Sequence, residues 1–358
     1  MSQPAVPEPV DALRRIAFLL ERSRAESRRV EAYRNAAKVI LPLGEDEVRR
    51  RVRAGTLTEL AGIGTSTSAV IEQAAAGRVP DKLAELEADV TGPLVEGGGT
   101  VRAALRGDLH SHSDWSDGGS PIEEMVASAM ELGHDYLALT DHSPRLTVAH
   151  GLTADRLRRQ IGVVDAINAH TGPSFTLLRA IEVDILDDGA LDQEPDLLAA
   201  LDVRVASVHS KLTMESPAMT RRMVAAVRNP LTNVLGHCTG RRVMPRAGDR
   251  GARSGGRARP PSTFDARAVF EACAETGTAV EINSRPERQD PPGELLTLAI
   301  ETGCLFALST DAHAPGQLDF LDYGCERAQR YGVPLERVVN TWPVQQLVDW
   351  ASGGPPGS

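Results

Sequence analysis

Histidine and carboxylate side chains recur at the ends of short apolar runs in the C-terminal part of the sequence. Imidazole and carboxylate ligands suit zinc, manganese or iron, whereas magnesium and calcium prefer shells of oxygen atoms. Nine such side chains exceed what one ion can hold, so the sequence predicts two or three divalent ions (Zn²⁺, Mn²⁺ or Fe²⁺) in one cavity, with Glu182 bridging two of them. The nine predicted ligands are His110, His112, Asp117, His142, Glu182, His209, His237, Asp311 and His313.

A cluster of divalent ions indicates phosphoester hydrolysis. Such ions lower the pKa of a bound water to about 7 and clamp phosphoryl oxygens, and a metal-bound hydroxide then attacks the phosphorus. Arginine forks and a lysine near the ligands would orient the phosphate, and surface ion pairing is the alternative role for these cations. The predicted catalytic residues are Glu182, Asp311, His209, Lys211, Arg285 and Arg288.

The elements that must bring these residues together are seven β/α units that begin near Leu105. Short apolar runs alternate there with helical segments, which predicts a parallel sheet, and the active sites of parallel barrels lie at the carboxyl ends of the strands. Six of the nine histidines fall at such ends, whereas His134, His150 and His170 fall in turns or loops and are predicted not to be ligands. The strands are expected to end near His112, His142, Glu182, His209, His237, Asn283 and His313, and the helices to cover residues 121–132, 154–169, 219–227, 265–276 and 294–302.

The N-terminal part has a helical pattern. Leu13, Ile16, Ala17 and Leu20 recur at the spacing of one helix face, and a similar stripe follows between residues 30 and 40. Residues 57–71 then show a tight Gly-x-Gly turn between helical stretches, which is a helix-hairpin-helix pattern whose backbone N–H groups can approach a DNA phosphate. A plain interhelical turn is the alternative. The predicted DNA contacts are Gly62, Ile63, Gly64, Thr65 and Ser66.

Composition limits the possible classes of protein. The chain has 358 residues, 41% of them hydrophobic, and a net charge of −10, which argues against a nucleic-acid partner. Residues 11–90 nevertheless carry 14 Lys and Arg against 13 Asp and Glu, so the acidity lies elsewhere. The sequence lacks a long apolar run, a basic leader and a C-x-x-C pair, and we therefore expect a cytoplasmic protein without a membrane partner.

Composition shifts also suggest domain boundaries. Glycines 97 to 99 indicate a linker, and residues 240–261 carry seven arginines against one aspartate, which predicts a mobile basic loop. The expected parts are a flexible tail (1–9), a helix-hairpin-helix domain (10–88), a linker (89–104), a barrel (105–345) with the basic loop, and a C-terminal tail (346–358).

The nine ligand positions resemble those of the PHP (polymerase and histidinol phosphatase) superfamily, whose members are distorted (β/α)7 barrels, over residues 105–351. The resemblance implies one ion on His110, His112, Glu182 and Asp311, a second on Glu182, His209 and His237, and a third on Asp117, His142 and His313. Asp117 takes a position where many phosphatases have histidine. This aspartate form looks like the version fused to bacterial family X DNA polymerases.

The closer likeness extends to the N-terminal part, since residues 31–37 and 60–64 resemble the DNA-binding eight-kilodalton domain of those polymerases. Two departures stand out. Only about 16 linker residues occupy the place of fingers and palm, so DNA synthesis is not expected, and Thr65-Ser66-Thr67 replaces the basic residues that the family often carries after the hairpin.

The resemblance implies a metal-dependent phosphoesterase that acts on DNA ends, as a 3′–5′ exonuclease or a 3′-end-processing repair enzyme, with residues 10–88 positioning the duplex. A small-molecule phosphatase of the histidinol-phosphatase type is the alternative. A non-catalytic scaffold for repair proteins, stabilised by metal, is a third reading.

Overall fold

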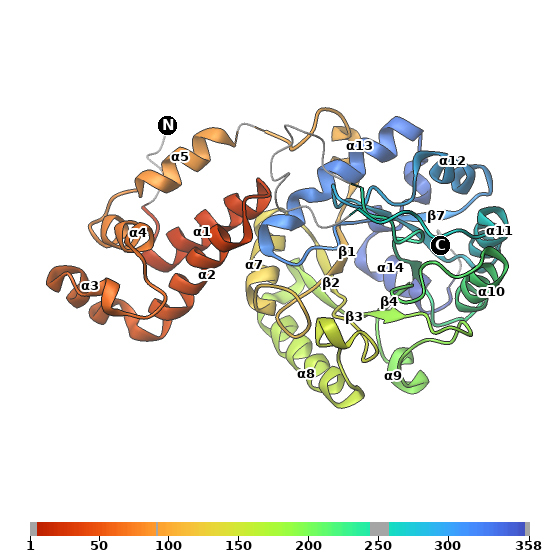
Figure 1. The fold of residues 1–358 in the computed structure, drawn as a ribbon, viewed down its shortest axis with the longest axis horizontal. Helices are drawn as coiled ribbons and strands as arrows, with labels where there is room; N and C mark the ends of the chain where they lie inside the picture. The colour runs from red at the N-terminus through yellow and green to blue at the C-terminus, as the bar shows by residue number, and fades with distance from the viewer. Residues whose placement is uncertain (1–5, 91, 244–257, 355–358) are drawn as a thin grey trace. The chain divides into compact units, whose positions relative to one another are not determined.

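The computed structural model describes residues 6–90, 92–243 and 258–354 (Figure 1). Two compact units divide the chain, one ending at Pro93 and the other beginning at Leu94. The first unit is helical and the second contains all seven strands.

The N-terminal unit packs short amphipathic helices. Its elements are α1 (Pro9–Arg22), α2 (Ser27–Ile40), η1 (Leu41–Leu43), α3 (Gly44–Ala54), η2 (Leu57–Glu59), α4 (Thr65–Ala75) and α5 (Asp81–Asp89). The predicted stripe of α1 is buried, including Leu13 and Ile16. A buried ion pair joins the first two helices, because Arg34 Nε and Nη2 on α2 donate to the Glu21 carboxylate on α1 at 2.9 and 2.8 Å. The first nine residues are thus not all tail, since α1 begins at Pro9.

The predicted hairpin turn lies between η2 and α4. Gly62 has a φ of +94°, in the left-handed region that favours glycine. Ile63 is buried and anchors the turn, whereas Gly62, Gly64, Thr65 and Ser66 are exposed. Four of the five predicted DNA contacts are therefore open to solvent on one turn and the first turn of a helix.

The larger unit is a sheet of seven parallel strands in the order β1 to β7. The strands are β1 (Gly107–Ser111), β2 (Tyr136–Leu139), β3 (Thr176–Asp184), β4 (Val203–Ser207), β5 (Val234–Leu235), β6 (Ala279–Asn283) and β7 (Leu305–Ser309). A parallel bridge between Ser111 and Ala312 joins the segment after β7 to β1 and closes the sheet into a barrel. The predicted α/β fold, a (β/α)7 barrel preceded by a small helical domain, is confirmed.

Helices surround the strands (Figure 1). Each of the five predicted helices starts and ends within three residues of the expected position, whereas α9, α13 and α14 were not predicted. The helices of this unit are α6 (Gly99–Ala104), α7 (Ile122–Glu131), α8 (Ala154–Thr171), α9 (Pro195–Ala199), α10 (Ser216–Val227), α11 (Ala266–Thr276), α12 (Gly293–Glu301), α13 (Leu321–Tyr331) and α14 (Val344–Ala351), with the 3-10 turns η3 (Thr147–Ala149), η4 (Gly172–Ser174), η5 (Pro315–Phe320), η6 (Leu335–Arg337) and η7 (Val339–Thr341).

The C-terminal segment differs from the prediction of a tail. Residues 346–351 belong to α14, and Leu347, Trp350 and Ala351 are buried. The helix packs into the apolar interior of the barrel, so its burial depends on contacts with strands that are remote in the sequence. The predicted linker (89–104) also differs from the prediction, because its last residues form α6.

The barrel interior is apolar near the beginnings of the strands. One or two residues of every strand meet there with Trp342 and with α14. The Trp342 and Trp350 rings pack edge to face with centroids 5.9 Å apart. The strand residues of this layer are Leu109, Tyr136, Ala138, Leu178, Ala180, Val203, Val205, Val234, Ala279 and Ala307.

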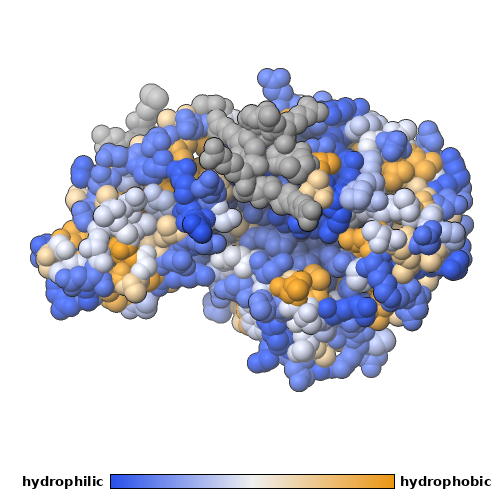
Figure 2. Space-filling model, viewed as in Figure 1, coloured by the Kyte–Doolittle hydropathy of each residue, from blue (hydrophilic) through white to orange (hydrophobic). Residues whose placement is uncertain are grey.

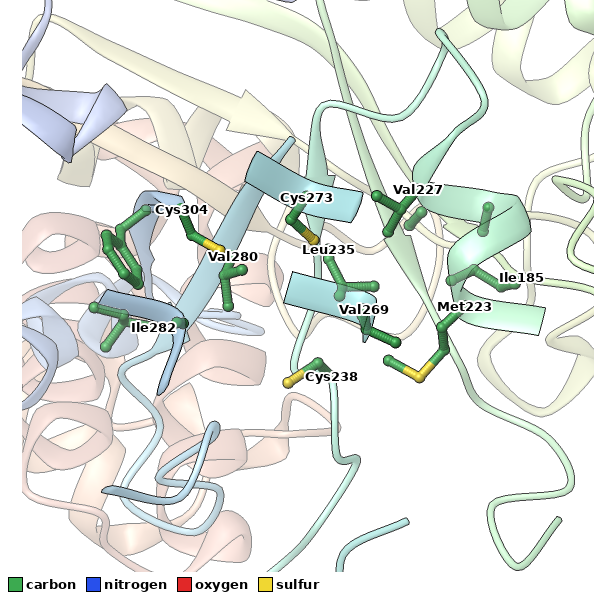
Figure 3. Packing of buried hydrophobic residues seen from close by; sticks show 14 of the residues in the cluster. Ile185, Met223, Val227, Leu235, Cys238, Val269, Cys273, Val280, Ile282 and Cys304 are labelled. Atoms are coloured by element: carbon green, nitrogen blue, oxygen red, sulfur yellow. The ribbon is translucent and has the colours of Figure 1, made fainter. Parts of the chain in front are cut away.

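A second apolar layer lies between the strands and the outer helices. Leu235 of β5 and Val280 of β6 pack with Val269 and Cys273 of α11 (Figure 3). Cys273 and the other three cysteines are free and buried. This layer holds the helices against the barrel, and the strand ends are left to carry polar residues.

The surface in view is mostly hydrophilic, and its hydrophobic residues form small separate spots (Figure 2). Every helix in the described ranges is too short or too polar to cross a membrane. Part of the predicted basic loop, including Arg246, Arg250, Arg253 and Arg257, lies outside the described residues.

Candidate metal centre

Side chains alternate between the two sides of each strand. A polar residue two positions after an interior residue therefore points to the same side, just beyond the apolar interior. Ala180 on β3 belongs to that interior, and Glu182, two residues on, points to the same side of the sheet. Ala279 and Glu281 repeat the pattern on β6. On β1 the register shifts between Asp108 and Ser111. A carboxylate and histidine layer therefore lies at the carboxyl ends of the strands.

Glu182 lies at the middle of this layer and is almost fully buried. Its Oε2 lies 2.9 Å from His142 Nδ1 and 3.3 Å from His110 Nε2. Its Oε1 lies 2.9 Å from His237 Nε2 and 3.2 Å from His209 Nε2. His112 Nε2 also lies 3.6 Å from Oε2, so the two carboxylate oxygens face different sets of histidines, which is the arrangement that a bridging ligand requires.

The other two predicted carboxylates lie beside the remaining histidines. Asp311 Oδ1 lies 3.5 Å from His112 Nε2. Asp117 Oδ1 lies 3.4 Å from both His142 Nε2 and His313 Nε2. Among the described residues, three groups have donor atoms close enough together to hold an ion: His112, Asp117, His142 and His313; His110, His112 and Asp311; and His142, Glu182 and His209.

The electrostatics favour ionised carboxylates. Burial alone would raise the pKa of Glu182, but the charges of His209 and His110 hold it well below its usual range. Burial likewise opposes ionisation of Asp311, whose pKa is nevertheless well below its usual range because Arg288 and Arg285 are close. The layer therefore presents negative oxygens among imidazole nitrogens.

Buried polar atoms without partners test whether this donor set suits metal ions. Both carboxylate oxygens of Glu182 are buried and have no hydrogen-bond partner among the described residues. Buried polar groups are normally paired, and two or three divalent ions would satisfy these oxygens and one ring nitrogen of each neighbouring histidine. The donor set therefore fits two or three ions with nitrogen and oxygen ligands. Within this layer, the ring nitrogens in the same condition belong to His110, His112, His142, His209 and His237.

Two carboxylates that sequence reasoning missed orient the histidines. Glu281 Oε1 lies 2.6 Å from His110 Nδ1, and its Oε2 accepts the backbone N–H of His237 at 2.6 Å. Asp184 Oδ1 accepts the backbone N–H of His209 and lies 3.4 Å from its Nδ1. A carboxylate bonded to the ring, as Glu281 is to His110, fixes the tautomer of a ligating histidine, whereas Asp184 holds the His209 backbone. The sequence held a signal for both residues: Glu281 lies two residues before the strand end at Asn283, and Asp184 lies two residues after Glu182.

We expect Glu281→Gln to weaken metal binding about 10- to 100-fold while the protein stays folded, because the amide cannot act as the charged acceptor of the His110 ring N–H. A competition titration against a zinc chelator measures this affinity. Glu271→Gln, at an exposed position of α11, is the matched control. Equal zinc affinity in the two variants would contradict the orienting role.

The three predicted phosphate-orienting residues differ in placement. Arg288 is buried, and its Nε donates to Asp311 Oδ2 at 2.7 Å. Arg285 Nη1 donates to the Asp311 carbonyl and lies 3.0 Å from His313 Nδ1. Lys211 is exposed, has a positive φ, and ion-pairs with Asp187 at 2.5 Å. The structure thus brings both arginines to the ligand layer, whereas Lys211 pairs with a residue outside the nine ligands.

Comparisons with known proteins agree with both units. Residues 108–285 match the PHP domain, and residues 4–78 match a helix-hairpin-helix domain. The chain is 37% identical over 236 residues to the DNA polymerase/3′-5′ exonuclease PolX of Bacillus subtilis, which covers 66% of this chain and 39% of the relative. The chain therefore corresponds to well under half of that relative's length.

Other relatives are smaller proteins. The probable phosphatase YcdX of Escherichia coli is 25% identical over 251 residues, covering 67% of this chain and 91% of the relative. A solved histidinol phosphate phosphatase from Lactococcus lactis, complexed with zinc, L-histidinol and phosphate, is 16% identical, with a TM-score of 0.42 over 59% of this chain and 87% of that one. The matched domains and the seven-stranded barrel agree: the chain carries a PHP domain, the domain of a family of metal-dependent phosphoesterases, and an N-terminal helix-hairpin-helix domain.

Proposed function

We propose that this protein hydrolyses phosphodiesters or 3′-end phosphates of DNA, in the manner of a 3′–5′ exonuclease. The observation that carries the reaction class is Glu182, whose two buried oxygens face different histidines and have no hydrogen-bond partner among the described residues. The 37% identical PolX relative and the helix-hairpin-helix match support DNA as the substrate.

The ligands and the two arginines have different roles in this reaction. Ions held by the nine ligands would supply Lewis-acid stabilisation of a phosphoryl group. Arg288 holds Asp311 in place through its Nε, and Asp311 has a φ of +53°, an uncommon backbone conformation that needs such support. Arg285 lies at the rim, half-buried, where its guanidinium can contact a phosphate oxygen.

Removing residues 1–90 tests the role of the N-terminal unit. Hydrolysis of a small chromogenic phosphoester should stay nearly intact, because the barrel forms its own compact unit. Hydrolysis of 3′-labelled DNA should weaken and depend less on salt, by roughly 0.7 to 0.9 in log–log slope for every phosphate that the protein no longer neutralises. The full-length variant Gly62→Ala, whose Cβ would strain the positive-φ turn and lie 3.3 Å from Val39 Cγ2, should weaken DNA hydrolysis in the same direction and leave the small phosphoester unaffected. Wild-type DNA cleavage by the truncated protein would remove the main support for a DNA substrate.

A small-molecule phosphatase is the second candidate, because the YcdX relative is a probable phosphatase that the chain covers almost completely. The net charge of −10 also favours it. Parallel assays with Mn²⁺ on 3′-labelled DNA and on histidinol phosphate separate the two. Turnover of histidinol phosphate alone would replace the DNA proposal.

A further inference from the structure

The described ends of the basic loop form a short arginine stem, defined here as Arg241, Arg242 and Arg259. The backbones of Arg242 and Arg259 exchange two hydrogen bonds of 2.9 Å in an antiparallel bridge. The next residue, Val243, donates its N–H to the Glu287 carbonyl at 2.7 Å. The stem is therefore an ordered structure attached to the loop that follows β6.

The side chain of Arg241 fixes this attachment, and that of Arg259 holds the two strands of the stem together. Arg241 Nε donates to the Arg288 carbonyl at 3.0 Å, and its Nη2 donates to the Gln289 carbonyl. Arg259 Nε donates to the Gly240 carbonyl at 2.6 Å. These bonds place the stem against Arg288, which itself holds the candidate ligand Asp311. The stem thus lies beside the metal centre.

The stem and the β6 loop concentrate positive charge. Burial and then the charge of Arg288 lower the pKa of both Arg242 and Arg259, and Arg285 adds to the effect at Arg242. The acidic groups that face the stem are Asp311 and Glu287 at Arg242 and Asp290 at Arg259, and Asp311 already accepts from Arg288. Like charges held together in this way favour an anion that bridges them.

A second, independent observation indicates where this anion would bind. Nη1 of Arg288 is buried and has no hydrogen-bond partner among the described residues. Its Nε bonds Asp311, so one side of the guanidinium faces the ligand layer while both N–H groups of Nη1 are left without a partner among the described residues. Arg242 is exposed, so its fork is open to a ligand from solvent. A planar fork of this kind matches two oxygens of a phosphate.

We propose that Arg242 and Arg259, together with Nη1 of Arg288, bind a second phosphate group of the substrate, next to the phosphoryl group held at the metal centre. This subsite rests on the proposed hydrolysis of phosphoesters and narrows its substrates to those with two neighbouring phosphates. A nucleic-acid strand supplies such a pair at every step. A small bisphosphate is the other source of the same chemistry.

Calorimetric binding to the Mn²⁺-loaded full chain tests the subsite without requiring turnover. Thymidine 3′,5′-bisphosphate and thymidine 5′-phosphate differ by one phosphate. The ratio of their affinities therefore measures how much the second phosphate contributes to binding. We expect Arg242→Ala to reduce this ratio about tenfold, as the loss of a charge-assisted hydrogen bond does, and Arg242→Ala/Arg259→Ala to reduce it further. Arg228→Ala removes the same charge at the C-terminal end of α10, where Arg228 pairs with Glu275, and should keep the wild-type ratio.

Hydrolysis of the trinucleotide TpTpT and the dinucleotide TpT distinguishes the sources. A wild-type preference for TpTpT that Arg242→Ala reduces assigns the subsite to a strand. If Arg242→Ala loses the preference for the bisphosphate in binding and the wild type hydrolyses neither TpTpT nor TpT, the subsite is assigned to a small bisphosphate. This outcome overturns the DNA proposal. A wild-type affinity ratio near one, or a ratio that Arg242→Ala leaves unchanged, overturns the subsite while leaving DNA hydrolysis to be judged by turnover.

Discussion

Glu182→Gln is expected to remove most of the bound divalent metal and to reduce phosphoester hydrolysis by roughly a thousandfold or more, since bound ions contribute several kcal/mol to such reactions. The carboxylate is buried, and its oxygens face His142 and His110 on one side and His237 and His209 on the other. An amide of the same shape keeps the packing but removes the charge and one acceptor oxygen. The change therefore acts on every ion that shares this ligand.

Elemental analysis of dialysed protein counts the ions, and a chromogenic phosphoester reports turnover. Glu271→Gln, an exposed change of the same type, controls for handling. Treatment of the wild type with EDTA should reproduce the loss and lower the melting temperature, because metal bound only by the folded state stabilises it. Two or more ions retained at normal turnover would rule out a bridging Glu182.

Trp350→Ala is expected to destabilise the barrel by about 3 to 5 kcal/mol, the usual cost of truncating a buried tryptophan. The ring packs on Trp342 and its Nε1 donates to the Gly277 carbonyl at 3.0 Å. The adjacent Ala351 carbonyl accepts from Arg204 and Asn233, each at 2.8 Å, so α14 is bonded as well as packed. Loss of the indole leaves a cavity at the end of the barrel interior.

Urea unfolding of the truncated protein that lacks residues 1–90 isolates the transition of the barrel. Gln345→Ala changes an exposed residue of the same helix and should alter the free energy of unfolding by less than about 0.5 kcal/mol. Equal midpoints for the two variants would show that α14 contributes little to the barrel.

The sequence was sufficient to predict the barrel and to place the candidate ligands near the ends of its strands, because both follow local rules. Parallel strands carry their active residues at one end, so a histidine or carboxylate after each apolar run, as at His142 and His209, leads to one cluster of donor atoms. The grouping of particular ligands around particular ions stays a prediction that metal counting will test.

Three features depended on information that local patterns lack. The residues of α14 have helical spacing, but their burial comes from an interior built by seven distant strands. Glu281 could be recognised as an orienting group only once β6 was placed beside β1 and His110. Lys211 follows His209 by two residues, yet its positive φ and the nearby Asp187 direct its ammonium into a surface ion pair.

The closure of the barrel has a consequence for the order in which the chain folds. The helices of the N-terminal unit contact near neighbours in the sequence and can form early during synthesis, whereas Thr310 and Asp108, which bond where the barrel closes, are 202 residues apart. The β1 edge stays unpaired on that side until the residues after β7 have been made. Asp311 and His313 join the other candidate ligands only with that closure, so the full set of candidate ligands would be available to metal ions only in a chain that has finished its barrel.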